Sequence, residues 1–161
     1  MKTHREHIHY EEYDSPDILP EEERLLIQKA EEALQGSYSP YSRFAVGAAV
    51  LLENGKIITG SNQENASYPV GVCAESLALF YASHEYPGVK VKALAVTAKS
   101  GNPKTQSEPV KPCGACRQVI AETESRSKES MKIILKAEKG KTIIINGVKN
   151  LLPLGFSGED L

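Results

Sequence analysis

Two short segments, far apart along the chain, carry all three of its cysteines and constrain how it can fold. Residues 73–75 read Cys-Ala-Glu, and residues 112–116 read Pro-Cys-Gly-Ala-Cys. Each segment lies where a polar loop enters a stretch with the apolar pattern of a helix. In the second segment the Cys-x-x-Cys spacing lets two sulfurs from one helical turn reach one metal ion. If Cys73 supplies a third sulfur, the fold must bring the starts of these two helices together.

This set of ligands is typical of a catalytic zinc site. Structural zinc sites are closed by four protein ligands, whereas catalytic sites keep three and leave one position for water. The first turn of a helix presents unpaired N–H groups and the positive end of the helix dipole, which lower the pKa of a thiol. The positions of Cys73, Cys113 and Cys116 therefore predict three thiolates on one Zn²⁺ ion.

Glu75 stands two residues after Cys73, close enough to reach a water on the metal without binding the metal itself. Zinc brings the pKa of such a water toward neutrality, and a carboxylate can then take its proton and pass protons to a substrate. His or Cys followed by x-Glu, and later Pro-Cys-x-x-Cys, is the pattern of zinc-dependent nucleobase deaminases, in which the glutamate is the general acid and base. Glu75 is therefore the candidate catalytic residue.

Other interpretations of the cysteines are weaker. A lone Cys-x-x-Cys can be a redox pair, but such pairs usually belong to a thioredoxin-like βαβ pattern. A structural zinc site requires a fourth ligand, and His84, the one histidine beyond the N-terminal segment, is expected at the far end of the helix that begins near Cys73. Cys73 alone could be a buried packing residue, but the adjacent glutamate would then be a coincidence.

The length and charge of the chain limit the classes of partner that it can bind. The chain has 161 residues, a net charge of −2 and a pI of about 6.1, which suit one compact domain without the basic surface that nucleic acid or an anionic membrane requires. The sequence shows no signal peptide and no apolar stretch long enough to span a bilayer. We therefore expect a cytoplasmic protein with a small-molecule partner. In cytoplasmic proteins, cysteines bind metal ions more often than they form disulfides.

The order of helix and strand patterns predicts an α/β fold. A helical period follows Pro20, where three glutamates favour a first turn, and Gly36 is a natural stop. Asn54-Gly55 between two apolar runs predicts a β-hairpin. The order of the elements favours one mixed sheet covered by helices on both faces. The expected elements are helices at 21–34, 73–82 and 113–123, a short last helix at 148–152, and strands at 45–52, 56–59, 91–98, 131–137 and 142–145.

Residues 1–18 and residues 19–161 are expected to differ in structure. The first segment is charged and His-rich, which favours a polar arm or an additional edge strand. Metal binding by His4, His7 and His9 is a weaker interpretation of it. Residues 19–161 contain no linker or repeat, so we expect them to form a single zinc domain.

With these residues established, the chain resembles the cytidine deaminase family, in the small class that binds zinc through three cysteines. The resemblance implies a three-layer α/β/α sandwich with a mixed five-stranded sheet, one zinc ion per subunit and a homotetramer. It also implies hydrolytic deamination of cytidine and 2′-deoxycytidine to uridine and 2′-deoxyuridine with release of ammonia, a reaction of pyrimidine salvage. The resemblance covers roughly residues 22–161, and its motifs are Ser37–Phe44, Val46–Ala49, Asn62–Tyr68, the two cysteine segments with Arg117 and Gln118, Leu151–Pro153 and Glu159–Leu161.

The resemblance assigns roles to residues around the zinc. Asn62 and Glu64 would hydrogen-bond the ribose 3′-hydroxyl, which selects nucleosides over free cytosine and leaves the 2′ position free. Phe44 would pack beside the sugar and the base. Glu75 would also bind ring nitrogen 3 and the amino group, while the backbone N–H of Ala74 would orient the base.

Two further aromatic residues match positions of the family that depend on the oligomer. Tyr68 and Phe156 correspond to residues that enter or border the active site of a neighbouring subunit in the family's tetramer. Without the family, packing in a core or an interface explains these two residues, and Phe44, equally well, because aromatic side chains dominate cores. The resemblance therefore predicts composite active sites.

Ser76 departs from the family pattern, because members with three cysteines usually carry an arginine directly after the catalytic glutamate. Three thiolates already give a Zn²⁺ site a negative charge, and an over-rich site should slow the attack of the zinc-bound water. Hydrogen-bond donors around the ligands are the usual remedy. The candidates here are the two helix N-termini, the Ser76 hydroxyl and Arg117. We expect a more electron-rich zinc that is still catalytic.

Two other functions stay open from the sequence. Blasticidin-S deaminases share the zinc motif, although the Asn62 and Glu64 pair favours cytidine as the substrate. From a different class, a zinc-stabilised nucleoside-binding module with little turnover remains an alternative because of Ser76. Deamination of a polynucleotide is disfavoured by the acidic balance and by the lack of interleaved basic and aromatic residues.

Overall fold

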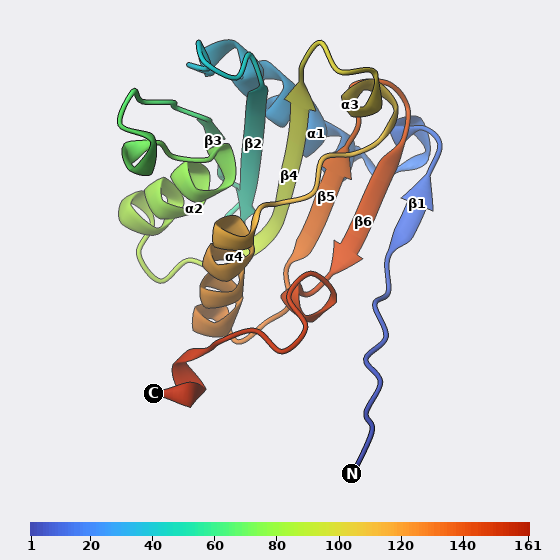
Figure 1. Cartoon of the computed structure of the whole chain (residues 1–161), viewed down its shortest axis with the longest axis vertical. Helices are drawn as coiled ribbons and strands as arrows, with labels where there is room; N and C mark the ends of the chain where they lie inside the picture. The colour runs from blue at the N-terminus through green and yellow to red at the C-terminus, as the bar shows by residue number, and fades with distance from the viewer.

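The computed structural model describes all 161 residues and contains one mixed sheet of six strands (Figure 1). The strand order is β1-β6-β5-β4-β2-β3; β4 and β5 run parallel, and the other neighbouring pairs are antiparallel. The strands are β1 (Glu11–Tyr13), β2 (Ala45–Leu52), β3 (Ile57–Ser61), β4 (Val91–Lys99), β5 (Lys132–Lys136) and β6 (Thr142–Asn146). The helices are α1 (Glu21–Ala33), α2 (Ala74–Glu85), α3 (Pro103–Ser107) and α4 (Gly114–Ser127).

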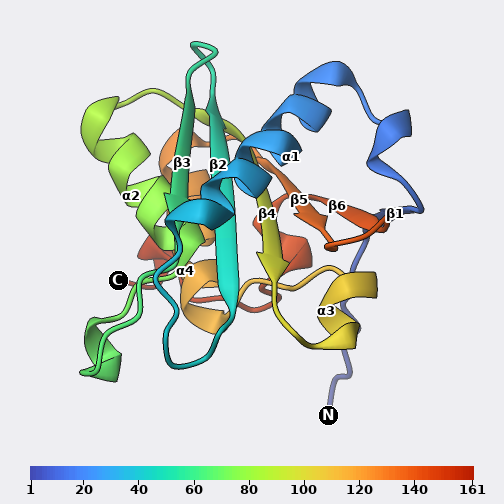
Figure 2. The same ribbon diagram turned by 90° about the horizontal axis from the view of Figure 1, so that it is seen from above.

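Apolar side chains form one cluster on each face of the sheet, as strand alternation requires. One face packs against α1, through Leu26 and Ile27, and the other packs against α2 and α4, through Ala78 and Ile120. Figure 2, turned from the first view, shows α1 in front of the sheet and α2 and α4 behind it. These contacts confirm the expected α/β/α sandwich.

Two glycines let the flanking helices lie directly on the strands. A Cβ atom on Gly47 of β2 would lie 2.1 Å from the Ala30 carbonyl oxygen of α1. A Cβ atom on Gly60 of β3 would lie 2.7 Å from the Ala74 carbonyl oxygen, in the first turn of α2. Real Cβ atoms do not approach so closely, so any side chain at Gly60 would push the start of α2 away from the sheet. Gly60 therefore fixes the depth at which residues 73–76 lie.

The fold differs from the sequence prediction at three places. The sheet has six strands rather than five, because residues Glu11–Tyr13 pair with β6 as β1. A short helix, α3, lies between the predicted strand at 91–98 and the predicted helix at 113–123, where no element was expected. The Asn102 side chain accepts a hydrogen bond from the Lys104 N–H at 2.9 Å and caps this helix. The predicted last helix is a three-residue 3₁₀ turn, Val148–Asn150.

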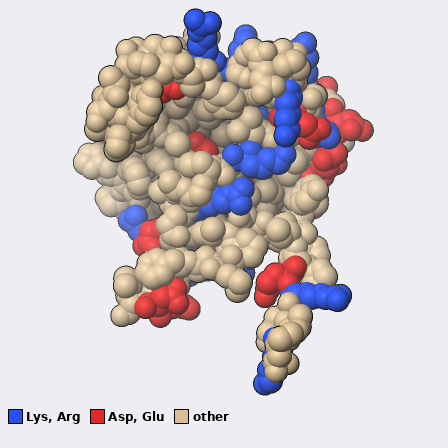
Figure 3. Space-filling model, in the orientation of Figure 1, with Lys and Arg blue, Asp and Glu red and all other residues tan.

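Charged side chains of both signs share the face seen in Figure 3. Basic side chains form a short row across its middle, while acidic side chains gather at its right edge and near both chain ends. None of the helices combines the length and the hydrophobicity needed to cross a membrane.

Candidate active site

Two helices begin at cysteines and bring the two cysteine segments together. Cys73 is the residue that caps α2, and Cys113 caps α4, where its sulfur accepts a hydrogen bond from the Cys116 N–H at 3.5 Å. The two helices pack against each other on the same face of the sheet. The structure therefore confirms that Cys73 and Cys113 lie at helix N-termini, where the dipole favours thiolates.

The three sulfurs are arranged as the ligands of one metal ion. All three lie within 4.8 Å of one another, and no carboxylate belongs to the group. The Sγ atoms of Cys73 and Cys113 are 3.9 Å apart. Two thiolates bound to one zinc at about 2.3 Å in tetrahedral geometry are separated by roughly 3.8 Å, so the residues fit this ion. Cys116 is buried, whereas Cys73 and Cys113 are accessible to solvent, which leaves the fourth side open.

Neighbouring polar groups differ in whether they reach these sulfurs. The Ser76 hydroxyl lies 3.5 Å from the Cys116 Sγ in a buried contact, so it can donate a hydrogen bond to that sulfur when the sulfur is a thiolate. The Arg117 guanidinium instead donates to the carbonyl oxygens of Pro112 at 2.9 Å and Leu151 at 2.7 Å. Arg117 therefore fixes the backbone that precedes Cys113, and none of its hydrogen bonds goes to a sulfur.

Glu75 lies in the first turn of α2 and is 5% exposed. Burial raises the pKa of its carboxyl group, and its own backbone N–H and the Cys116 thiol partly oppose the shift. A hydrogen bond from the Cys116 thiol lowers the pKa of Cys73, and the same bond raises that of Cys116. A buried carboxyl group beside the sulfurs is suited to hold a proton and release it.

A pocket of about 540 Å³ opens beside the sulfurs and ends at Cys73. This volume lies in the range of pockets that enclose small organic ligands, which is about 300–1,000 Å³. Asn62 and Glu64 both line it, so the structure places these two predicted site residues next to a cysteine of the cluster. The other lining residues are Tyr41, Ser42, Gln63, Asn65, Tyr68, Gly71 and Val72.

Asn62 has one hydrogen-bonding position left for a ligand. Its Oδ1 accepts from the Ser37 hydroxyl at 2.6 Å and from the Val46 N–H at 2.8 Å. Its Nδ2 donates to the Phe44 carbonyl oxygen at 2.8 Å. A side-chain amide has two acceptor positions and two N–H donors, so a single N–H of Asn62 is unused.

Glu64 offers a hydrogen-bond acceptor that complements the free N–H donor of Asn62. Its Oε2 accepts from the N–H groups of Tyr41 at 2.8 Å and Ser42 at 3.3 Å, and its Oε1 accepts from the Ser42 hydroxyl. The Ser42 hydroxyl, and then the two N–H groups, lower the pKa of Glu64, so the carboxylate is ionised at neutral pH. One acceptor position remains on Oε1. One free donor and one free acceptor match a single hydroxyl group, which both accepts and donates.

Of the remaining predicted residues, Tyr68 lines this pocket, whereas Ala74, Phe44 and Phe156 are not among its lining residues. Ala74 is fully buried at the start of α2, and Phe44 is half-buried next to the Asn62 hydrogen bonds. Tyr68 is 75% exposed and meets the Tyr41 ring edge-on, with the ring centroids 6.1 Å apart. Phe156 lines a separate hollow on the outer side of α4, so within one chain it is not part of the Asn62 pocket.

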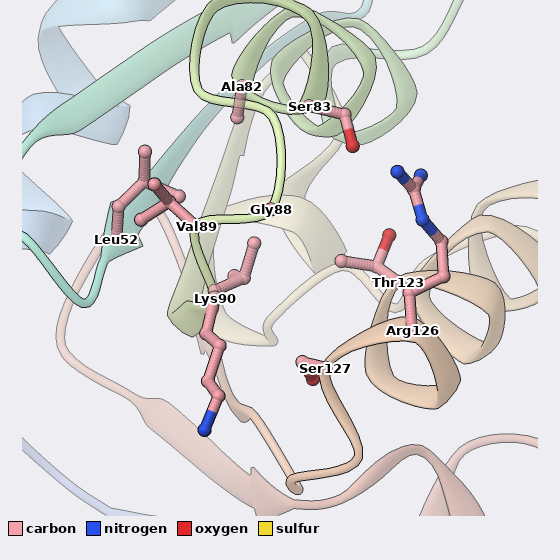
Figure 4. Close-up of a pocket in the computed structure, with 10 residues that line it drawn as sticks. Leu52, Ala82, Ser83, Gly88, Val89, Lys90, Thr123, Arg126 and Ser127 are labelled. Atoms are coloured by element: carbon pink, nitrogen blue, oxygen red, sulfur yellow. The ribbon is translucent and has the colours of Figure 1, made fainter.

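A smaller hollow, shown in Figure 4, lies at the opposite ends of α2 and α4. It measures about 170 Å³ and is lined by Ser83, Lys90 and Arg126, among others. Lys90 is already paired with Glu129. The hollow is below the size of most ligand pockets, and no predicted site residue lines it.

Comparison with known families agrees with this geometry. The family described as the cytidine and deoxycytidylate deaminase zinc-binding region matches residues 20–130, which include all three cysteines and Glu75. The chain belongs to the cytidine and deoxycytidylate deaminase family. Because the family region is a zinc-binding one and the three sulfurs fit that ion, zinc is the cofactor of this family member.

Curated relatives and solved structures extend the match over most of this deaminase. The chain is 45% identical over 139 residues to the cytidine deaminase of Halalkalibacterium halodurans, which covers 86% of this chain and 96% of the relative. It is 46% identical over 137 residues to that of Sporosarcina psychrophila, covering 84% and 92%. Among solved structures, the cytidine deaminase of Burkholderia pseudomallei superposes with a TM-score of 0.71 at 38% identity, covering 83% of this chain and 98% of that one.

Sequence reasoning missed the residues that hold the pocket side chains in place. Ser37 and Ser42 fix Asn62 and Glu64 through their hydroxyl groups. The available signal was local: a serine hydroxyl often bonds backbone N–H groups two residues on, and the Ser42 oxygen accepts from the Phe44 N–H at 3.0 Å. No local pattern indicated that these two hydroxyl groups would bind Asn62 and Glu64, which lie more than twenty residues away.

Proposed function

We propose that this enzyme hydrolytically deaminates cytidine and 2′-deoxycytidine to uridine and 2′-deoxyuridine and releases ammonia. The observation that carries the proposal is the position of Glu75, a buried carboxyl group beside three sulfurs that fit one zinc ion. The pocket that ends at Cys73 has room for a nucleoside. The chain matches two curated cytidine deaminases over 96% and 92% of their lengths.

The chain's own residues account for the movement of protons. Zinc, when bound by Cys73, Cys113 and Cys116, supplies a Lewis acid that makes water a better nucleophile. Glu75 then takes one proton from the attacking water and delivers it to ring nitrogen 3. After the addition it transfers the second proton to the departing amino group. The raised pKa of Glu75 suits a group that must both accept and return a proton.

The pocket supports recognition of one sugar hydroxyl. Asn62 offers one N–H and Glu64 offers one acceptor position, so together they bind a single hydroxyl group in both directions. We assign this hydroxyl to the 3′ position. No donor or acceptor of this pair is left for the 2′-hydroxyl, so cytidine and 2′-deoxycytidine are both expected to be substrates.

The direct test is the fall of ultraviolet absorbance when cytidine is added, measured beside the zinc content of the same sample. Turnover by the zinc-loaded enzyme is the expected result. Fully loaded enzyme that leaves cytidine unchanged would favour a nucleoside-binding module instead. Parallel assays with blasticidin S as the substrate distinguish a cytidine deaminase from a blasticidin-S deaminase.

Ser76 is predicted to tune the zinc site through its contact with Cys116. Replacing Ser76 with Ala removes the hydroxyl that lies 3.5 Å from this sulfur and leaves the helix intact. Changes to groups that support metal ligands typically cost about 10–100-fold in metal affinity, so we expect roughly tenfold weaker zinc binding, measured by competition with a chromogenic chelator. Ser76→Thr, which keeps the hydroxyl, is the control. Equal zinc affinity in Ser76→Ala would show that the contact is without effect.

We propose that the enzyme assembles as a homo-oligomer, in the tetrameric form that the family resemblance implies. Phe80 and Tyr81 on the outer face of α2 are 58% and 50% exposed, and Tyr68 and Val70 nearby in the chain are 75% and 66% exposed. Large exposed apolar side chains that are adjacent, as Phe80 and Tyr81 are, are characteristic of interaction surfaces. Phe156 would then border a neighbour's pocket, and Tyr68, which lines the pocket of its own chain, would do so as well.

Replacing Phe80 with Glu is expected to weaken this assembly, because a charge would be buried without a partner. Size-exclusion chromatography with light scattering should show a shift from the oligomer toward dimers or monomers. Ile18→Glu is the matched control, since Ile18 is 71% exposed and distant in sequence from this surface. An unchanged mass for Phe80→Glu would place the interface elsewhere.

We also infer a cytoplasmic location. Three thiols that must stay reduced to bind zinc suit a reducing compartment.

A further inference from the structure

The turn formed by residues 41–44 is built around one hydroxyl group. The Ser42 oxygen accepts a hydrogen bond from the Phe44 N–H at 3.0 Å and donates to Oε1 of Glu64. Between them, Arg43 has a backbone φ of 55°, a left-handed conformation that is uncommon for a residue with a side chain. A tight turn of this kind persists only where surrounding contacts hold it.

The same turn holds both oxygens of Glu64. The N–H groups of Tyr41 and Ser42 occupy Oε2, and the Ser42 hydroxyl occupies one of the two acceptor positions on Oε1. The direction of the last free acceptor position is therefore set by the Ser42 hydroxyl. Ser42 also lines the pocket together with Asn62 and Glu64. Because Asn62 donates to the Phe44 carbonyl oxygen, the turn is connected to both residues that face the ligand.

We propose that Ser42 is a positioning residue that sets how Glu64 recognises one ligand hydroxyl. The inference rests on the proposed function, in which Asn62 and Glu64 bind the 3′-hydroxyl of a nucleoside. The Ser42 hydroxyl leaves Glu64 a single acceptor position and aims it into the pocket. Without this hydroxyl, the two N–H groups still hold Oε2, but Oε1 has two open acceptor positions and its direction is no longer fixed. The Phe44 N–H also loses its partner.

The test compares ligands that differ at a single hydroxyl. Calorimetric binding of uridine and 3′-deoxyuridine is measured for the wild type and for Ser42→Ala, because the products are bound without being consumed. Hydrogen bonds to charged groups correspond to roughly a tenfold or larger change in affinity. We expect Ser42→Ala to weaken uridine binding about tenfold and to leave 3′-deoxyuridine binding nearly unchanged. With cytidine as substrate, KM should rise more than kcat falls.

Ser42→Thr restores the hydroxyl and should recover uridine affinity, and thermal unfolding verifies that each variant is folded. Equal weakening for uridine and 3′-deoxyuridine would show that Ser42 has only a general structural role. No weakening for either ligand would overturn the proposal as well. Absence of cytidine turnover by the zinc-loaded wild type contradicts the proposed function instead, and the binding comparison still decides the role of Ser42.

Discussion

Replacing Glu75 with Gln is expected to lower kcat for cytidine deamination by roughly 10³–10⁴-fold, the contribution of an efficient general acid and base. This loss corresponds to about 4 to 5.5 kcal/mol of activation free energy. The substitution keeps the size of the side chain and removes its capacity to accept a proton. Glu75 is 5% exposed, so water cannot easily replace it as the proton carrier. Initial rates of absorbance change at saturating cytidine provide the measurement.

The interpretation of this variant depends on what it retains. Glu75 does not belong to the group of metal-binding side chains, so zinc content and uridine affinity should stay close to those of the wild type. Glu85→Gln is the matched control, since Glu85 lies on the same helix, at its opposite end, and is exposed. Full activity is expected of this control. If Glu75→Gln kept more than about a tenth of the wild-type kcat, another group would have to move the protons.

The elements that position the active site follow from local sequence patterns. The Asn54-Gly55 hairpin, the first turn of α1 and the starts of α2 and α4 all have signals within a few residues of the feature itself. An additional edge strand was one of two structures expected for residues 1–18, but no local signal showed which residues would form it, because Glu11–Tyr13 becomes a strand only by pairing with β6, more than a hundred residues later. Helix α3, which was not among the expected elements, has a local signal in Asn102 and Pro103, the cap and the first residue of the helix.

The active site was predictable to a similar extent. Cysteine spacing carries chemical information that does not depend on the rest of the fold, so the sulfur cluster follows from the sequence. The hydrogen-bond partners of the surrounding side chains do not follow from the sequence. Ser42 and Glu64 are 22 positions apart and their contact depends on how the loop before β2 meets the loop after β3. For the same reason the sequence did not show that Arg117 bonds backbone carbonyls while Ser76 contacts a sulfur.

Removal of one zinc ligand is the other change with a large expected effect. Replacing Cys116 with Ala deletes the buried sulfur of the cluster and leaves two thiolates, too few for a stable zinc site of this kind. We expect zinc content to fall from one per chain to nearly zero and deamination to fall to background. The sheet and its apolar clusters do not involve the metal, so the variant should remain folded.

Its stability should nevertheless fall, because an ion that binds only the folded state stabilises that state by mass action. At a free zinc concentration about a thousandfold above Kd, the loss is roughly 4 kcal/mol, which lowers Tm by on the order of 10 °C for a chain of this size. If the loss acts through zinc, the wild type treated with a chelator should unfold near the Tm of Cys116→Ala. Ser125→Ala, an exposed position on the same helix, should keep both zinc and Tm. Stoichiometric zinc in purified Cys116→Ala would exclude this sulfur as a ligand.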